Sequence, residues 1–113
     1  MKIAIPTSDG INIGKNLIDS TSYLIFNVQF GEIIDEEVRP ILLNNIHTDE
    51  EYLISPIDDC SVIISDRMNE NIATALMKKK KEVIHTDESN ITKIVMNYLN
   101  NYLLKESNTL CCP

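Results

Sequence analysis

Tryptophan is absent from this 113-residue sequence, and aromatic residues make up only 5% of it. Aliphatic side chains, chiefly Ile, Leu and Val, must therefore form the hydrophobic core. Three cysteines are too few and too unevenly placed for the disulfide framework of a small secreted domain. No apolar run approaches the roughly 20 residues that cross a bilayer, and Pro6, Ser8 and Asp9 interrupt the N-terminal run where a signal peptide needs its apolar region. We expect a cytoplasmic protein with no membrane partner.

Positive charge is also scarce, with 10 Lys and Arg against 17 Asp and Glu and a formal net charge of −7. A net-acidic chain repels nucleic-acid phosphates unless it carries a local basic patch. The concentrated basic run Lys78–Lys81 directly follows an amphipathic helical pattern. Cations at that position interact favourably with the exposed carbonyls of a helix C-terminus. We therefore interpret this run as a solvated helix end and expect no nucleic-acid partner.

The rest of the composition, 43% apolar and 24% charged residues, is typical of a globular protein with a core of ordinary size. A chain of this length suits one domain. The periodic patterns end near residue 104. We expect a single domain over residues 1–104 and a loose polar tail over residues 105–113.

The first third of the chain has the pattern of an antiparallel meander. Met1–Ile5 is an apolar run, Ser22–Phe30 is rich in β-branched and aromatic residues, and Ile33–Leu43 alternates charged with aliphatic residues. Gly31 lies where a hairpin turn would join the last two segments. Pro40 indicates that the third strand is an edge strand.

The rest of the chain alternates helical and strand patterns. Thr48 and Glu51 have the spacing of a capping box, which predicts a short helix that Pro56 ends. A continuous β-branched run predicts a strand covered on both faces, and apolar spacing of three and four residues predicts two further helices. The expected elements are a helix over His47–Ile57, a strand over Val62–Ile64, a helix over Asn69–Lys80, a strand over Glu82–His85 and a helix over Ile91–Leu104.

The predicted order is β-β-β-α-β-α-β-α, which indicates an α/β fold with a mixed five-stranded sheet. The first three strands pair antiparallel, the first, fourth and fifth are parallel, and right-handed crossovers give the order 3-2-1-4-5. Ligands of open α/β sheets favour the crevice at the carboxyl ends of the parallel strands. Here that crevice lies between the loops after the first and fourth strands, and the connection over residues 11–19 can reach it. We expect main-chain amides and short polar side chains to line it. The candidate binding residues are Thr7, Ser8, Asp9, Gly10, Asn16, Ser65, Asp66, Arg67, Met68 and Asn69.

Four stretches cover nearly the whole chain in a recognisable order and spacing: MKIAIPTSDG, YLIFNVQFGEII, DDCSVIISDRMNENIATAL and EVIHTDESNITKIVMNYL. Together they resemble the dinitrogenase iron–molybdenum cofactor biosynthesis family of small single-domain proteins. The resemblance implies a ribonuclease H-like sheet, consistent with the predicted strand order. It also implies a carrier or accessory protein for an iron–sulfur-based cluster, with a metallocofactor assembly or acceptor protein as its partner.

The sequence departs from this family's pattern at two places. Many members have His-Phe-Gly in the loop before the second strand, where the imidazole is a candidate cluster ligand, and the matching positions here are Asn16-Leu17-Ile18. Asn is a poor ligand for soft metal centres. Members also tend to have a glycine-rich turn after the fourth strand, where this chain has Asp66-Arg67-Met68-Asn69. Either the protein binds a different ligand, or it has kept the fold and lost cluster binding.

Five cysteine and histidine residues are candidate metal ligands. Cys60 begins the most apolar strand at its amino end, which favours a core cysteine over a ligand. The vicinal Cys111 and Cys112 have the best chemistry for a soft metal, but two adjacent thiols cannot complete a tetrahedral site alone. His85 ends the fifth strand near the crevice and is either a ligand or an ordinary strand-end residue. His47, in a polar loop, is interpreted as solvent-exposed.

Catalytic motifs are missing from the sequence. It contains no G-x-S-x-G elbow and no phosphate-binding loop, and the first strand has no acidic residue for two-metal nuclease chemistry. We expect a non-enzymatic binding protein that carries an iron–sulfur-based cluster or cofactor precursor. The alternative is a protein-interaction or regulatory module on the same scaffold, and the sequence leaves open whether the chain forms a homodimer.

Overall fold

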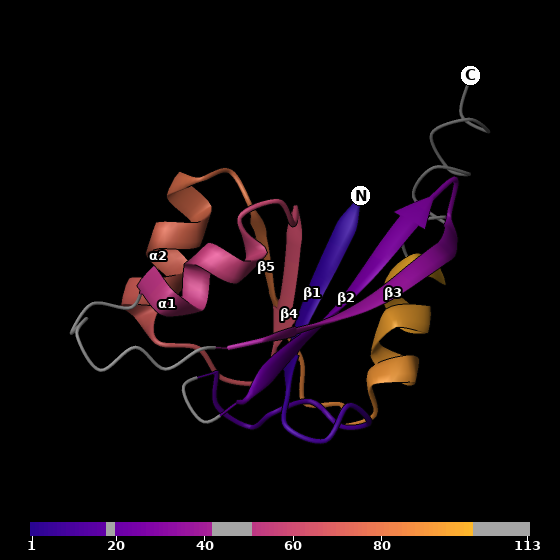
Figure 1. Ribbon diagram of the computed structural model, residues 1–113, viewed down its shortest axis with the longest axis horizontal. Coiled ribbons are helices and arrows are strands. Elements are labelled where there is room, and N and C mark those ends of the chain that lie inside the picture. Colours follow the sequence, from indigo (N-terminus) through magenta and orange to yellow (C-terminus); the bar gives the residue numbers. More distant parts are fainter. Residues whose placement is uncertain (18–19, 42–50, 101–113) are drawn as a thin grey trace.

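The computed structural model describes residues 1–17, 20–41 and 51–100 of the chain (Figure 1). Most of the predicted elements are present, with bounds that differ by a few residues. The strands are β1 (Lys2–Thr7), β2 (Ser22–Gln29), β3 (Glu32–Pro40), β4 (Val62–Ser65) and β5 (Glu82–His85). The helices are α1 (Glu51–Ile54), which continues into a 3-10 turn over Ser55–Ile57, α2 (Glu70–Lys78), and a helical segment over residues 91–100.

The five strands form one mixed sheet in the order β3-β2-β1-β4-β5. β1 pairs antiparallel with β2, and β2 pairs antiparallel with β3. β4 pairs parallel with both β1 and β5. The fold class and the strand order predicted from the sequence are therefore confirmed.

Side chains alternate between the two faces of the sheet, as strand geometry requires. In β1, Ile3 and Ile5 belong to one buried cluster, while Ala4 between them belongs to the other. β4 repeats the pattern, with Val62 and Ile64 on the first face and Ile63 on the second. The sheet thus separates two aliphatic cores.

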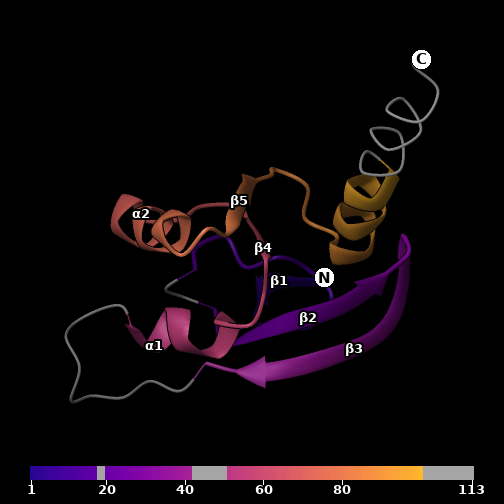
Figure 2. The same cartoon turned by 90° about the horizontal axis from the view of Figure 1, so that it is seen from above.

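Helices cover both faces and make a three-layer arrangement (Figure 2). The first face packs against the helical segment 91–100, and the second packs against α1 and α2. The residues that these helices contribute are Ile91, Ile94, Val95 and Leu99 on the first face, and Leu53, Ile54, Ile72 and Leu76 on the second. The connection after β4 therefore crosses the second face of the sheet, and the connection after β5 crosses the first.

Several boundaries differ from the predictions for identifiable reasons. β1 continues through Pro6 to Thr7, beyond the predicted end at Ile5. Pro6 is tolerated because the pairing between β1 and β4 extends only to Ala4, so its missing N–H interrupts no bond of that ladder. The predicted cap Thr48 and the last residues of the predicted third strand lie outside the described residues, as do residues 101–104 and the tail 105–113.

Candidate functional site

The loop after β1 forms a compact turn that uses its own polar groups. The Thr7 hydroxyl donates to the carbonyl of Asn12 at 2.7 Å and accepts from the amide of Gly10 at 2.9 Å. One carboxylate oxygen of Asp9 accepts from the amides of Ile11 and Asn12, both at 2.8 Å. These bonds from Asn12 and Ile11 lower the pKa of Asp9 from its ordinary 3.8 to about 2. Gly10 provides the positive φ of +77° that the turn requires.

The connection that follows lies across the carboxyl ends of the parallel strands. Near β5, the amide of Ile13 donates to the carbonyl of Ser89 at 2.8 Å, and the amide of Ile91 donates to the carbonyl of Ile11 at 3.1 Å. Near β1, the amide of Gly14 donates to the carbonyl of Pro6 at 2.9 Å. The first part of the connection is therefore fixed to both the start of the helical segment 91–100 and the end of β1.

The second part of the connection is fixed to the loop after β4. Asn16 forms a parallel bridge with Arg67, and the amide of Leu17 donates to the carbonyl of Arg67 at 3.3 Å. The Ser20 hydroxyl donates to the carbonyl of Asn16 at 3.0 Å. Gly14 is needed here because a Cβ atom would come within 2.1 Å of the Ser20 hydroxyl.

These bonds change how the predicted crevice can act. The sequence predicts a binding edge with main-chain amides available to a ligand. In the structure, the amides of residues 10–14 and 17 donate to acceptors within the chain itself. A ligand at this edge must therefore contact side chains or carbonyls rather than these amides.

Two of the candidate residues lie on opposite faces of the sheet. Thr7 follows the alternation of Ile3 and Ile5 toward the first face, whereas Ser65 follows Ile63 toward the second. Both are buried, with exposed fractions of 2% and 1%. The Ser65 hydroxyl has no hydrogen-bond partner among the described residues. Neither side chain lies on the open edge that we predicted from the sequence.

The loop after β4 divides into structural and exposed residues. Asn69 caps α2, since its side-chain oxygen accepts from the amide of Asn71 at 2.9 Å. Met68 packs against the second core. Asp66 is half-buried, Arg67 is exposed, and no ion pair joins these two described residues. Arg67 is therefore the residue of this loop best placed to meet a ligand, together with the exposed Ser8, Asp9 and Asn16.

The candidate metal ligands are widely separated. His85 ends β5 opposite Ser65 and is exposed at the carboxyl edge. Cys60 precedes β4 at the other end of the sheet and is buried, and this burial raises the pKa of its thiol to about 11. Cys111, Cys112 and His47 lie outside the described residues. Within the described ranges, no group of three or more His, Cys, Asp or Glu side chains could hold a metal ion.

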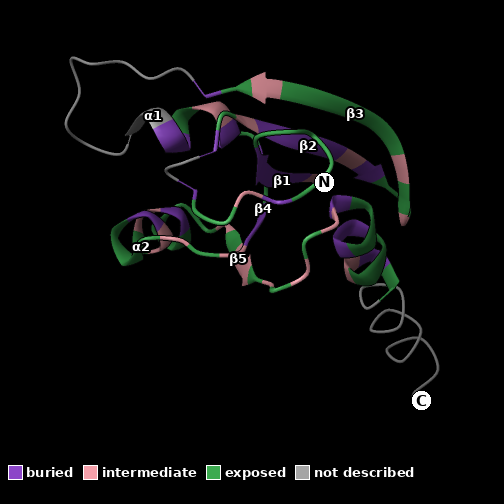
Figure 3. Cartoon of the chain, turned by 90° about the horizontal axis from the view of Figure 1, so that it is seen from below, coloured by how far each residue is buried: buried purple, intermediate pink, exposed green. Residues whose placement is uncertain are grey.

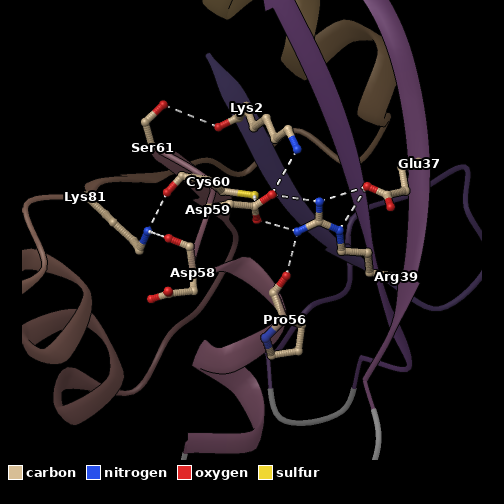
Figure 4. Close-up of polar contacts among 9 residues, drawn as sticks. All are labelled: Lys2, Glu37, Arg39, Pro56, Asp58, Asp59, Cys60, Ser61 and Lys81. Carbon is tan, nitrogen blue, oxygen red and sulfur yellow. Dashed lines mark hydrogen bonds and ion pairs between the residues drawn. The ribbon is translucent and has the colours of Figure 1, made fainter.

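A charged network across the second face of the sheet was not predicted from the sequence (Figure 4). Arg39 of β3 contacts both carboxylate oxygens of Asp59, and it also pairs with Glu37 at 2.8 Å. The Arg39 guanidinium donates to the carbonyl of Pro56 at 2.8 Å, and Lys2 reaches Asp59 at 2.9 Å. Hydrogen bonds from Arg39 and then Lys2 hold the pKa of Asp59 well below its ordinary value. The network links β1, β3 and the connection into β4.

The basic run has a structural role at the amino end of β4. Lys81 is half-buried, and its ammonium group donates to the carbonyls of Asp58 at 2.7 Å and Cys60 at 2.6 Å. Lys79 pairs with Asp58 at 3.5 Å. Our interpretation of the run as a fully solvated helix end is therefore incomplete, because two of its lysines hold the turn before β4.

Comparisons with known proteins identify the fold. No protein-family model and no curated protein matches the chain. Among solved structures, PH0822 superposes with a TM-score of 0.78 and 14% identity, covering 89% of this chain and 92% of that one. A protein of Methanocaldococcus jannaschii, described as a candidate dinitrogenase, has a TM-score of 0.69 and 22% identity, with 89% of each chain covered. A Thermotoga protein, described as a candidate NifB protein, has a TM-score of 0.69 and 11% identity, covering 88% of this chain and 87% of that one.

The superpositions establish a shared fold, and the sequence identities are too low to establish more. None of the helices in the described part of the chain combines the length and the apolar character needed to cross a bilayer. The chain therefore has a mixed α/β fold that is shared with proteins whose descriptions refer to nitrogenase.

Proposed function

We propose that this chain is a small binding protein that carries an iron–sulfur-based cluster or a related cofactor precursor to an assembly or acceptor protein. One observation carries the proposal: two of the solved structures that share its fold over nearly their whole length are described as a candidate dinitrogenase and a candidate NifB protein. The sequence resemblance described above points to the same class of cargo. We assign no catalytic residue.

The carboxyl edge of the parallel strands is the proposed cargo site. His85 is exposed there, and its imidazole is a suitable ligand for iron. Arg67 lies on the neighbouring loop and can balance the negative charge of a thiolate-ligated cluster. His85 is the only described Cys or His at this edge, and a single side chain cannot hold a cluster. Cys111, Cys112 or residues of the acceptor protein must supply the remaining ligands.

Anaerobic reconstitution of the full chain with ferrous iron and sulfide tests the proposal. We expect visible charge-transfer absorption together with protein-bound iron and sulfide. The variant H85A and the double variant C111S/C112S should each lower the bound iron, because each removes proposed ligands. The variant C60A is the matched control, since this thiol is buried at the opposite end of the sheet. A colourless, iron-free chain, or equal loss in all three variants, would remove the cargo assignment.

A second candidate function is favoured by the loop after β1. Its amides and the carboxylate of Asp9 form hydrogen bonds within the chain, so these groups are already satisfied without a ligand. A loop held by its own hydrogen bonds suits a protein-interaction or regulatory module that binds no metal. Affinity capture of a protein partner by the metal-free chain, with the same yield from the C111S/C112S variant, would support this function over the first.

A further inference from the structure

Phe30, at the tip of the hairpin between β2 and β3, is fully exposed, with an exposed fraction of 100%. It forms a two-residue turn with Gly31, and both residues have positive φ, +54° and +77°. Turns of this kind strongly prefer Asn-Gly, Asp-Gly or Gly-Gly, since L-residues with a large side chain are strained there. A phenylalanine therefore occupies a position that its backbone conformation disfavours.

Neither the turn nor the core accounts for this side chain. Because the ring is wholly exposed, it gains no packing that could offset the strained backbone. Strained backbone recurs at ligand-binding and functional sites, and exposed apolar side chains mark interaction sites where several of them lie on one surface. The tip therefore has the character of an anchor for another molecule.

Among the residues that the structure describes, the strand that leaves this tip is an edge with no further strand paired to it. β3 is the last strand of the sheet, and its residues are exposed along nearly the whole strand (Figure 3). Val38 lies opposite Leu24 and Glu36 lies opposite Phe26, so both point to the first face. Ile34 lies at a register shift between β2 and β3, where Asn27 pairs with Asp35 and Val28 pairs with Ile33, so it is the extra residue of an irregular step at the edge. Ile34 and Val38 are 53% and 62% exposed, so β3 has one exposed apolar side chain before Glu36 and one after it.

Acidic side chains dominate the rest of the edge. Glu37 pairs with Arg39, whereas no lysine or arginine of the described residues pairs with the other three carboxylates. These three are Glu32, Asp35 and Glu36. Charges on an edge strand can serve merely to prevent edge-to-edge aggregation. That role does not explain Phe30, Ile34 and Val38, since a purely protective edge would have polar residues at those positions.

The charges disfavour a second copy of this chain as the occupant. If two β3 strands paired antiparallel about Glu36, this residue would face its own copy, and Asp35 would face Glu37. Like charges directly opposite each other destabilise strand pairs. The occupant must instead bring positive charge in an extended conformation.

We propose that β3 is a docking strand for a basic extended segment of another protein, which adds to the sheet edge while Phe30 anchors the tip. Main-chain hydrogen bonds along the edge would provide affinity, and lysine or arginine residues facing the carboxylates would provide selectivity. This inference does not depend on the proposed cargo. The hairpin tip lies beside the start of β1, at the opposite end of the sheet from His85.

Two synthetic peptides as long as β3 test the proposal on the full chain. The first alternates lysine with valine and has a pair of leucines at each end, so that either strand direction brings apolar side chains to Phe30. The second replaces every valine with proline, which keeps the charge but cannot pair as a strand. We expect the first peptide to bind, measured by fluorescence anisotropy, and to protect β3 amides from hydrogen exchange. Equal binding of the two peptides, or no protection of β3, would overturn the proposal.

Matched variants separate the docking strand from general electrostatic attraction. E36K should weaken binding about tenfold, because it replaces a cross-strand attraction with a repulsion. D87K reverses an exposed charge near the opposite end of the sheet and should leave the affinity unchanged. F30N should weaken binding while the fold remains intact. Equal effects of E36K and D87K would show that only net charge matters, and concentration-dependent dimers that E36K disrupts would assign the edge to a second copy instead.

Discussion

Replacing Phe30 with Asn should stabilise the protein. An L-residue in the left-handed region costs roughly 1–2 kcal/mol, and Asn tolerates this conformation because its short polar side chain bonds to the local backbone. The phenyl ring is fully exposed, so its removal sacrifices no buried apolar area. The expected net change is a gain of about 1 kcal/mol in the free energy of unfolding, most of the conformational cost.

Urea denaturation followed by circular dichroism measures this gain. The midpoint should rise with an unchanged m-value, because the surface exposed on unfolding is nearly the same. Heating should show a Tm increase of several degrees for a gain of about 1 kcal/mol in a domain of this size. Phe30→Ala is the control, since it removes the same ring but keeps an ordinary L-residue with positive φ. It should therefore gain little.

One result would refute this reasoning. If Phe30→Asn were no more stable than Phe30→Ala, the backbone of the turn would not be strained by its present residue. If both variants were less stable than the natural chain, the ring would make stabilising contacts within the molecule. Either outcome would also remove the reason for regarding Phe30 as an anchor.

Three further predictions concern a helix end, a loop and a buried hydrogen bond. Lys80 follows α2 with φ +63°, so Lys80→Gly should raise the unfolding free energy by about 1 kcal/mol in urea titrations, while Lys80→Ala should not. The folded-state pKa of Asp9 is lowered to about 2, so the stability it contributes is complete above its ordinary pKa of 3.8 and is lost as pH falls from about 4 to about 2. Asp9→Asn keeps an acceptor for the two amides and should flatten the stability curve in that window; a slope equal to that of the natural chain would contradict this assignment. The buried Tyr23 hydroxyl donates to the carbonyl of Leu53 at 2.7 Å, so Tyr23→Phe should cost about 1–2 kcal/mol in urea titrations, and an unchanged midpoint would show that this bond does not hold α1.

Local patterns were sufficient to predict the strand order. The β-rich segment before Gly31 and the alternating segment after it form the predicted hairpin, and the β-branched Val62–Ile64 forms the central buried strand. These signals are short-range, because a hairpin needs only its turn and its alternation. Right-handed crossovers then leave few arrangements for the remaining strands.

Contacts between residues distant in sequence could not be predicted in this way. Arg39 and Asp59 are 20 positions apart, and no local pattern indicates that they meet. The course of the loop after β1 is similar, since it depends on hydrogen bonds to the carbonyls of Ser89 and Arg67. Strand alternation could have shown that Thr7 and Ser65 face opposite sides of the sheet, once the two strands were taken as parallel neighbours in register.

The two departures from the resembled family meet at one place in the structure. Asn16 is at the position that the resemblance matches to the family's loop histidine, and Arg67 belongs to the segment matched to its glycine-rich turn. Asn16 and Arg67 form a bridge, and the amide of Leu17 donates to the Arg67 carbonyl. The two positions at which this sequence departs from the family's pattern are therefore in contact in the structure. Asn16 is a poor ligand for a soft metal centre, so the carrier function that we propose needs ligands from elsewhere. Variants of Cys111, Cys112 and His85, rather than of these loops, therefore decide between the two proposed functions.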